Sequence, residues 1–231
     1  MKTLGLIGGM SWESTLPYYR IINQVVKSRL GGLHSAQLVL YSVDFAQIEK
    51  LQMEGDWQRA GELLGQAALS LKAAGAEKLV LCTNTMHKVA AQIEEAAQLP
   101  LLHIADATAE VIRASGINRV GLLGTRFTME QDFYRGRLSQ AFGIDVVIPD
   151  EPDRADVHRI IYQELCQGVI SEDSRRIYRD VMRRLVEQGA GGIILGCTEI
   201  GLLVQEADAS VPLFDTADLH ARAAALWSVE S

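Results

Sequence analysis

The chain has 231 residues, a formal net charge of −7 and a composition that is ordinary for a globular protein. Lys and Arg are not clustered, which argues against a nucleic-acid surface, and the apolar start of the chain is too short for a membrane span and lacks the core of a signal peptide. We therefore expect a cytoplasmic protein. The three cysteines, Cys82, Cys166 and Cys197, include no CxxC pair, so neither a disulfide framework nor a zinc site is expected.

Short apolar runs alternate with amphipathic stretches along the whole chain. The predicted strands are, in chain order, residues 3–8, 37–42, 78–81, 101–103, 119–123, 145–148, 192–195 and 213–214. Helical periodicity is clearest over residues 11–31, 56–76 and 173–192, and the last of these helices should end at Gly189. Continuous apolar strands separated by helices predict a parallel sheet that is covered on both faces.

The sequence also repeats itself. "LGLIGG" at residues 4–9 returns as "VGLLGT" after 116 residues, "GAEKLVLCTNT" at 75–85 returns as "GAGGIILGCTE" after 114, and "LPLLHIAD" at 99–106 returns as "VPLFDTAD" after 112. Three matches in one order predict a duplication, with two similar α/β lobes related by a pseudo-twofold axis and an active site between them. Each lobe would be a parallel sheet flanked by helices. The first lobe is expected at residues 1–105 plus 211–231, and the second at 106–210.

The duplication places Thr83 and Cys197 at equivalent positions. Because sites in open α/β sheets lie at the carboxyl ends of strands, Thr83 and Cys197 are predicted to flank one small ligand. Backbone N–H groups and a helix dipole near Cys197 would favour its thiolate, which can act as a general base or a nucleophile. The alternative for Cys197 is a small buried core residue, which is the commoner fate of a free cysteine.

Polar residues follow both of these strand ends. Thr83, Asn84 and Thr85 in the first copy, and Thr198 and Glu199 in the second, can offer backbone and side-chain donors to a carboxylate at the start of a helix. Simple helix capping is the alternative, and it is compatible with ligand binding. Cys82 is expected within its strand and pointing away from Thr83, whereas Cys166 is either a core residue or part of the cleft lining.

The first glycine loop has the wrong spacing for a nucleotide site. Gly8 and Gly9 are instead expected to let the backbone approach a small ligand, with Met10 and Ser11 reaching over it and Thr125 lining the opposite wall. The five histidines show no metal-binding spacing. His87 follows the Thr-Asn-Thr loop closely enough to tune the site, although a position on a surface helix is the simpler expectation.

Four motifs, "GLIGGMSWEST", "LCTNTMH", "LLGTRFTMEQDFY" and "LGCTEIGLL", occur in this order along the chain. Together they resemble the cofactor-independent aspartate/glutamate racemase family, and especially its bacterial amino-acid racemase branch with "GGMSWEST" in the first loop. The resemblance implies a reaction without pyridoxal phosphate or another cofactor, in which two cysteines face opposite sides of the substrate α-carbon. Mapped onto this chain, the second cysteine is Cys197 and the first is Thr83. Asn84, Thr85 and Thr198 fall on carboxylate-binding positions, and Met10 lies in the first loop.

The chain departs from this pattern in two ways. Thr83 is a poor acid or base in water, so it is activated by a neighbour, or passes protons through a water, or leaves Cys197 as the stronger catalyst on one face; we favour the asymmetric enzyme. The family's Arg and Lys for a side-chain carboxylate are also replaced, because Gln52 and Cys166 lie near those places. A neutral Gln can bond a carboxylate, an amide or a hydroxyl.

The expected function is therefore racemisation of an amino acid at Cα, with aspartate or glutamate first and homoserine-like polar amino acids next. A one-cysteine decarboxylase or isomerase of the same superfamily is the first alternative, and a non-catalytic amino-acid-binding protein is the second. The expected partner is a small amino acid, with no nucleic acid or membrane, and the resemblance also implies a homodimer.

Overall fold

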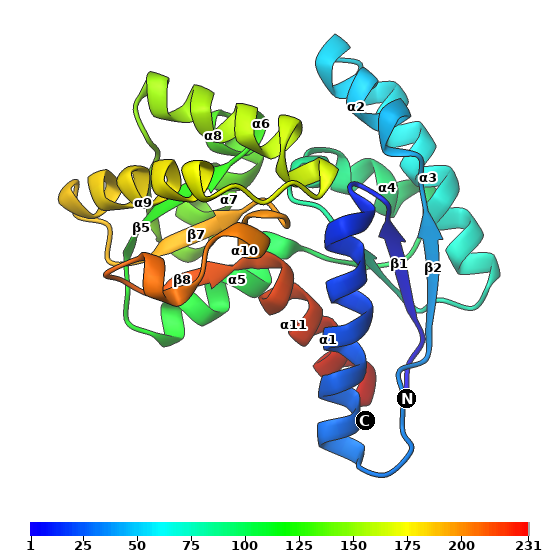
Figure 1. The fold of residues 1–231 in the computed structure, drawn as a ribbon. Coiled ribbons are helices and arrows are strands. Elements are labelled where there is room, and N and C mark those ends of the chain that lie inside the picture. The colour runs from blue at the N-terminus through cyan, green and yellow to red at the C-terminus, as the bar shows by residue number, and fades with distance from the viewer. Residues whose placement is uncertain (231) are drawn as a thin grey trace. The chain divides into compact units, whose positions relative to one another are not determined.

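The structure, a computed structural model, describes residues 1–230. The chain divides into two compact units, Met1–Ile104 with His220–Ser231 and Ala105–Leu219 (Figure 1). No helix within residues 1–230 is both long enough and apolar enough to cross a membrane.

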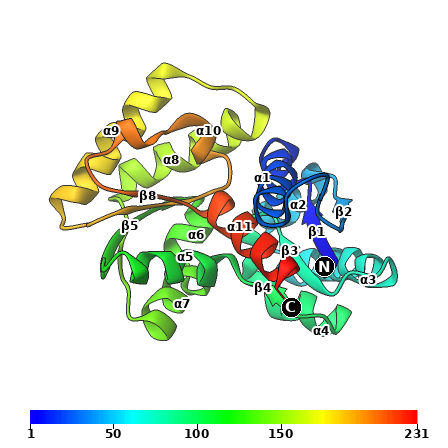
Figure 2. The same ribbon diagram turned by 90° about the horizontal axis from the view of Figure 1, so that it is seen from below.

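The first unit contains a four-stranded parallel sheet with the strand order β2-β1-β3-β4. The strands are β1 (Leu4–Gly8), β2 (Leu38–Ser42), β3 (Lys78–Leu81) and β4 (Leu101–Leu102). The helices between them are α1 (Trp12–Leu30), α2 (Phe45–Glu54), α3 (Trp57–Ala73), the 3₁₀ helix η1 (Thr85–Val89) and α4 (Ala90–Ala97). Figure 2 shows α1 on one face of this sheet and α3 and α4 on the other.

The second unit contains a parallel sheet of the same kind, with the strand order β6-β5-β7-β8. Its strands are β5 (Arg119–Gly124), β6 (Asp145–Val147), β7 (Ile193–Gly196) and β8 (Leu213–Asp215). Its helices are α5 (Ile104–Ala114), α6 (Arg126–Glu130), α7 (Asp132–Phe142), α8 (Glu151–Gln163), η2 (Leu165–Gln167), α9 (Glu172–Glu187), α10 (Ile200–Leu203) and η3 (Glu206–Asp208). Figure 2 shows α8 and α9 on one face of the sheet and α5 and α7 on the other. The last helix, α11 (Thr216–Val229), begins in this unit and continues into the first.

The predicted fold class is confirmed, because β1 to β4 and β5 to β8 have the same order and all pair in parallel. All eight predicted strands are present, with no end displaced by more than one residue. The return of the chain to the first unit differs from the expected boundary at residue 211: it occurs at His220. The reason is that β8 completes the second sheet by pairing with β7, and so keeps residues 211–219 in the second unit.

The first unit has its core where α3 packs on the sheet. Ala60, Leu64, Ala67, Ala68 and Leu71 recur at helical spacing on one face of α3 and are almost completely buried. They join the sheet residues Ile7, Leu79 and Leu81 in one apolar cluster. Full burial of a leucine side chain contributes roughly 1.5–3 kcal/mol, so this face is sufficient to fix α3 on the sheet.

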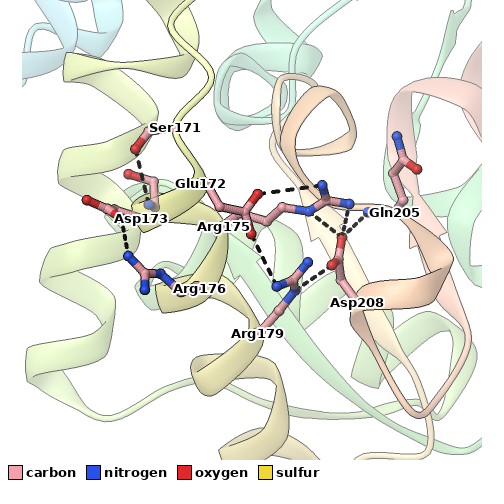
Figure 3. Close-up of polar contacts among 9 residues, drawn as sticks. Ser171, Glu172, Asp173, Arg175, Arg176, Arg179, Gln205 and Asp208 are labelled. Carbon is pink, nitrogen blue, oxygen red and sulfur yellow. Dashed lines mark hydrogen bonds and ion pairs between the residues drawn. The ribbon is translucent and has the colours of Figure 1, made fainter.

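In the second unit a charged network fixes the segment that follows α10 (Figure 3). Asp208 is almost fully buried and receives Arg175 at 2.8 Å and Arg179 at 2.5 Å, both from α9. The backbone N–H of Gln205 donates to the same carboxylate at 2.8 Å. Burial alone would raise the pKa of Asp208, but these donors hold it at about 2. The network therefore ties the chain between β7 and β8 to α9.

Candidate active site

The loops after β1 and β3 leave the first sheet side by side, because Ile7 is paired with Leu81 at the ends of these strands. This is also where the strand order reverses, which is the usual position of a site in an open α/β sheet. Gly9 has a φ of +92°, and a Cβ there would lie 2.3 Å from the Val43 carbonyl oxygen. A Cβ on Gly8 would lie 2.4 Å from Cγ2 of Thr15. The protein's own packing therefore requires both glycines, and their approach to a ligand stays a prediction.

Met10 and Gln52 are both buried near the segment that follows β3. Met10 belongs to the apolar cluster of the first unit, and so does Met86 of η1. The Gln52 amide donates to Sδ of Met86 at 3.0 Å. Gln52, the predicted specificity residue on α2, is thus hydrogen-bonded to the 3₁₀ helix η1.

Thr83 lies two residues beyond the end of β3, with only 7% of its surface exposed. Its backbone N–H donates to the Leu81 carbonyl at 2.8 Å, and its carbonyl accepts a hydrogen bond from Nδ1 of His87 at 2.7 Å. Within residues 1–230 the Thr83 hydroxyl itself makes no hydrogen bond. Asn84 and Thr85 are also buried, and the Asn84 side chain does not cap η1, so helix capping does not explain its presence.

His87 is 3% exposed, so the expectation of a surface helix position is wrong. The reason is that His87 contacts the segment that follows β4, where Ile104 N–H donates to Nε2 of His87 at 3.2 Å. The rings of His103 and His220 lie 4.6 Å and 5.8 Å from the His87 ring, measured between centroids. The signal in the sequence was the four-residue spacing from Thr83, which is one helical turn.

The corresponding loops of the second unit follow β5 and β7. Gly124 is paired with Gly196, and a Cβ on Gly124 would lie 2.7 Å from the Gly196 carbonyl oxygen. Thr125 is buried and caps α6 by accepting a hydrogen bond from Thr128 N–H at 3.3 Å. Cys197, Thr198 and Glu199 follow directly after β7 and are all buried.

Cys197 and Glu199 form a thiol–carboxylate pair. Sγ of Cys197 donates to Oε2 of Glu199 at 2.9 Å, and the Thr198 hydroxyl donates to the same oxygen at 3.0 Å. Burial raises the pKa of Cys197 well above its usual value and the Glu199 charge adds to this, while the Glu199 backbone N–H opposes it and is outweighed. The expected stabilisation of a thiolate is therefore wrong, and Cys197 rests as a thiol. The sequence analysis places Glu199 at the site but does not predict its hydrogen bond to Cys197. The Cys-Thr-Glu spacing directly after a strand is the feature of the sequence that indicates it.

The other two cysteines are less suited to acid–base chemistry. Cys82 is fully buried, with Sγ 3.7 Å from the Val80 carbonyl oxygen, and burial strongly raises its pKa. Cys166 is partly buried in η2, and its pKa is raised by burial and then by the charge of Glu199. Within residues 1–230 no group of three or more His, Cys, Asp or Glu side chains is arranged to hold a metal ion.

These observations define a duplicated α/β fold with a thiol and a carboxylate at one strand end. A model of the family described as Asp/Glu/Hydantoin racemase matches residues 7–224. The chain belongs to this family, and both the family and the isomerase class predicted from the four motifs are confirmed.

Individual relatives agree with this assignment. A crystal structure from Yersinia pestis, assigned as an Asp/Glu racemase, is 65% identical with a TM-score of 0.92, and each chain covers 100% of the other. An aspartate racemase homologue from Pyrococcus horikoshii OT3 is 34% identical with a TM-score of 0.84, again with 100% coverage of both chains. The broad specificity amino-acid racemase RacX of Bacillus subtilis is 22% identical over 92% of each chain.

Proposed function

We propose that the protein interconverts the L and D forms of an amino acid at Cα without a cofactor, using Thr83 on one face of the substrate and Cys197 on the other. One observation carries the proposal. The two residues lie 114 positions apart in a duplicated chain, each just beyond the second central strand, β3 or β7, of a sheet with the same strand order. The proposal requires the loops of the two units to meet around one substrate.

The chemistry on the Cys197 face begins with the thiol–carboxylate pair. The thiol proton passes along the 2.9 Å hydrogen bond to Glu199, and the resulting thiolate removes the α-proton of the substrate. The electron pair of the broken C–H bond remains on the substrate as a carbanion, and Cys197 becomes a thiol again. The Thr198 hydroxyl, which donates to the same oxygen of Glu199, orients the carboxylate for this transfer.

The chemistry on the Thr83 face completes the inversion. An alkyl hydroxyl keeps its proton near neutral pH, so Thr83 delivers a proton to the carbanion either directly or through a bound water. Solvent returns a proton to Thr83, and Glu199 releases to solvent the proton that it received from Cys197. Asn84, Thr85 and Thr198 would bind the α-carboxylate. Donors placed where negative charge develops are the main means by which the carbanion-like transition state is stabilised.

Aspartate and glutamate are the first substrates to test, since one structural relative is assigned as an Asp/Glu racemase and another is described as an aspartate racemase homologue. The buried amide of Gln52 is neutral, and it can equally bond a side-chain hydroxyl. Polar amino acids such as homoserine therefore belong to the same substrate class, in line with the broad specificity of RacX.

The test is proton exchange in D2O. Each enantiomer of aspartate, glutamate and homoserine is incubated with the protein, and deuterium at Cα and the sense of chirality are followed by NMR and chiral chromatography. Cys197→Ala should abolish exchange, and Thr83→Ala should abolish inversion while leaving exchange with retention at the Cys197 face. Cys82→Ala is the matched control, because it removes a buried thiol outside the proposed site. Exchange that survives Cys197→Ala would overturn the assignment.

The presence of one thiol, rather than two, at the equivalent positions favours a second candidate, a decarboxylase or isomerase that protonates one face only. Release of CO2 from an α-substituted malonate would support it. The third candidate, an amino-acid-binding protein, predicts a raised Tm with an amino acid and no exchange at Cα.

A further inference from the structure

We propose that His87 is a positioning residue for the Thr83 face, in that its Nδ1–H fixes the peptide group that carries Thr83. This inference rests on the proposed function, because it concerns the residue that we place opposite Cys197. His87 is not proposed to contact the substrate. It acts through the backbone of Thr83.

The hydrogen bonds of His87 determine its tautomer. The backbone N–H of Ile104 can only donate, so Nε2 of His87, 3.2 Å away, must be unprotonated. The neutral ring then carries its proton on Nδ1, which lies 2.7 Å from the Thr83 carbonyl oxygen and donates to it. Both ring nitrogens are thus engaged with backbone groups of fixed polarity, and the orientation of the ring is determined.

A second histidine is held in the same way beside the first. The Leu102 carbonyl can only accept, so Nε2 of His220, 2.8 Å away, carries the proton. Nδ1 of His220 then accepts from the hydroxyl of Tyr18 at 2.9 Å. Tyr18 and His220 are fully buried, and the His220 ring packs edge-on against His87. Helices α1 and α11 therefore support the ring that holds Thr83.

The consequence for Thr83 follows from its backbone. Its N–H is bound to Leu81 and its carbonyl to His87, so both peptide groups that flank its Cα are fixed. These two hydrogen bonds set the direction of the Thr83 Cα–Cβ bond, and therefore the positions that the hydroxyl can reach. Without the Nδ1–H donor, the Thr83 carbonyl would be a buried acceptor without a partner, and the loop would rotate to find one.

Two amide substitutions separate positioning from packing. In His87→Asn the side-chain amide nitrogen occupies the place of Nδ1 and can still donate to Thr83. In His87→Gln the amide occupies the place of Nε2, so the bond to Thr83 is lost. Inversion and exchange with retention are measured together in D2O for each variant. We expect the ratio of inversion to retained exchange to fall at least tenfold in His87→Gln and to stay within about threefold of the wild-type ratio in His87→Asn.

A purely structural role would lower both activities together and leave this ratio unchanged in both variants, which would overturn the proposal. The tautomer provides a test that needs no variant: ¹⁵N shifts of the histidines in the wild-type protein should show His87 protonated at Nδ1, and protonation at Nε2 would overturn the proposal. Absence of any exchange in the wild-type protein would instead refute the proposed function, so the two failures are distinguishable.

Discussion

Replacing Glu199 by Gln separates the charge of this residue from its shape. Two negative charges 2.9 Å apart, at an effective dielectric constant of about 20, repel by about 6 kcal/mol. At about 1.4 kcal/mol per factor of ten, this is about four powers of ten in thiolate population. The carboxylate charge is spread over two oxygens and the surroundings relax, so we expect a rise of at least about a hundredfold in the Cys197 thiolate at a given pH, and a lower pKa of Cys197.

The assay is alkylation of Cys197 by iodoacetamide as a function of pH, followed by peptide mass spectrometry so that Cys82 and Cys166 are counted separately. Glu187→Gln is the matched control, because it removes one negative charge from an exposed ion pair with Arg183 in the same unit. The profile of this control should coincide with that of the wild-type protein.

The same variant changes how exchange depends on pH. In the wild-type protein the thiolate forms by proton transfer from Cys197 to Glu199, without net loss of a proton from the pair. The rate of exchange at Cα should therefore be nearly independent of pH around neutrality. In Glu199→Gln the thiolate must form by loss of a proton to solvent, so exchange should rise about tenfold per pH unit below the pKa of Cys197. An alkylation profile that is unchanged by the substitution, or an exchange profile that stays flat in the variant, would refute the pairing of Cys197 with Glu199.

Three further predictions concern the stability of the fold and the thiol of Cys82. Asp208→Asn should lower the free energy of unfolding at pH 7 by about 1–2 kcal/mol, after allowance for the partly exposed arginine partners. Because the pKa of Asp208 is held at about 2, this difference should be fully present above about pH 4 and disappear as the pH falls toward 2 in urea titrations. Gly9→Ala should cost at least about 2 kcal/mol more than Gly55→Ala, since both have a positive φ but only Gly9 faces a backbone oxygen; equal Tm values would contradict this. Cys82→Ala should keep the rate of exchange at Cα within about twofold, and a large loss would bring Cys82 into the chemistry.

Most of the fold was predictable because the central strands β1, β3, β5 and β7 are almost fully buried and appear in the sequence as continuous apolar runs that end close to where the strands end. The duplication was readable for the same reason, since "LCTNT" and "LGCTE" both follow such a run. The boundary at residue 211 was not predictable, because β8 is three residues long and only its pairing with β7 assigns it to the second sheet.

The side-chain environment of the site was harder to predict. The sequence indicates that Cys197 follows a strand, but a thiolate is stabilised or destabilised by the side chains that surround it. The sequence shows that Glu199 is two residues from Cys197, but only the structure shows that its carboxylate points toward the sulfur. His87 was misplaced for a similar reason, because its burial depends on Ile104 and His220, which are distant in sequence.

The two sheets have the same strand order, but the equivalent strands β3 and β7 are followed by different side chains, Thr83 and Cys197. Thermodynamics limits what this difference can do to a racemase. Mirror-image amino acids have equal free energies in water, so the proposed arrangement, with a hydroxyl on one flank of the substrate and a sulfur on the other, would still leave the final mixture at one to one. The values of kcat/KM for the two enantiomers must then be equal. If Thr83 and Cys197 differ in catalytic strength, kcat and KM for one enantiomer must both exceed those for the other by the same factor. The faster direction is the one whose substrate half-saturates at the higher concentration.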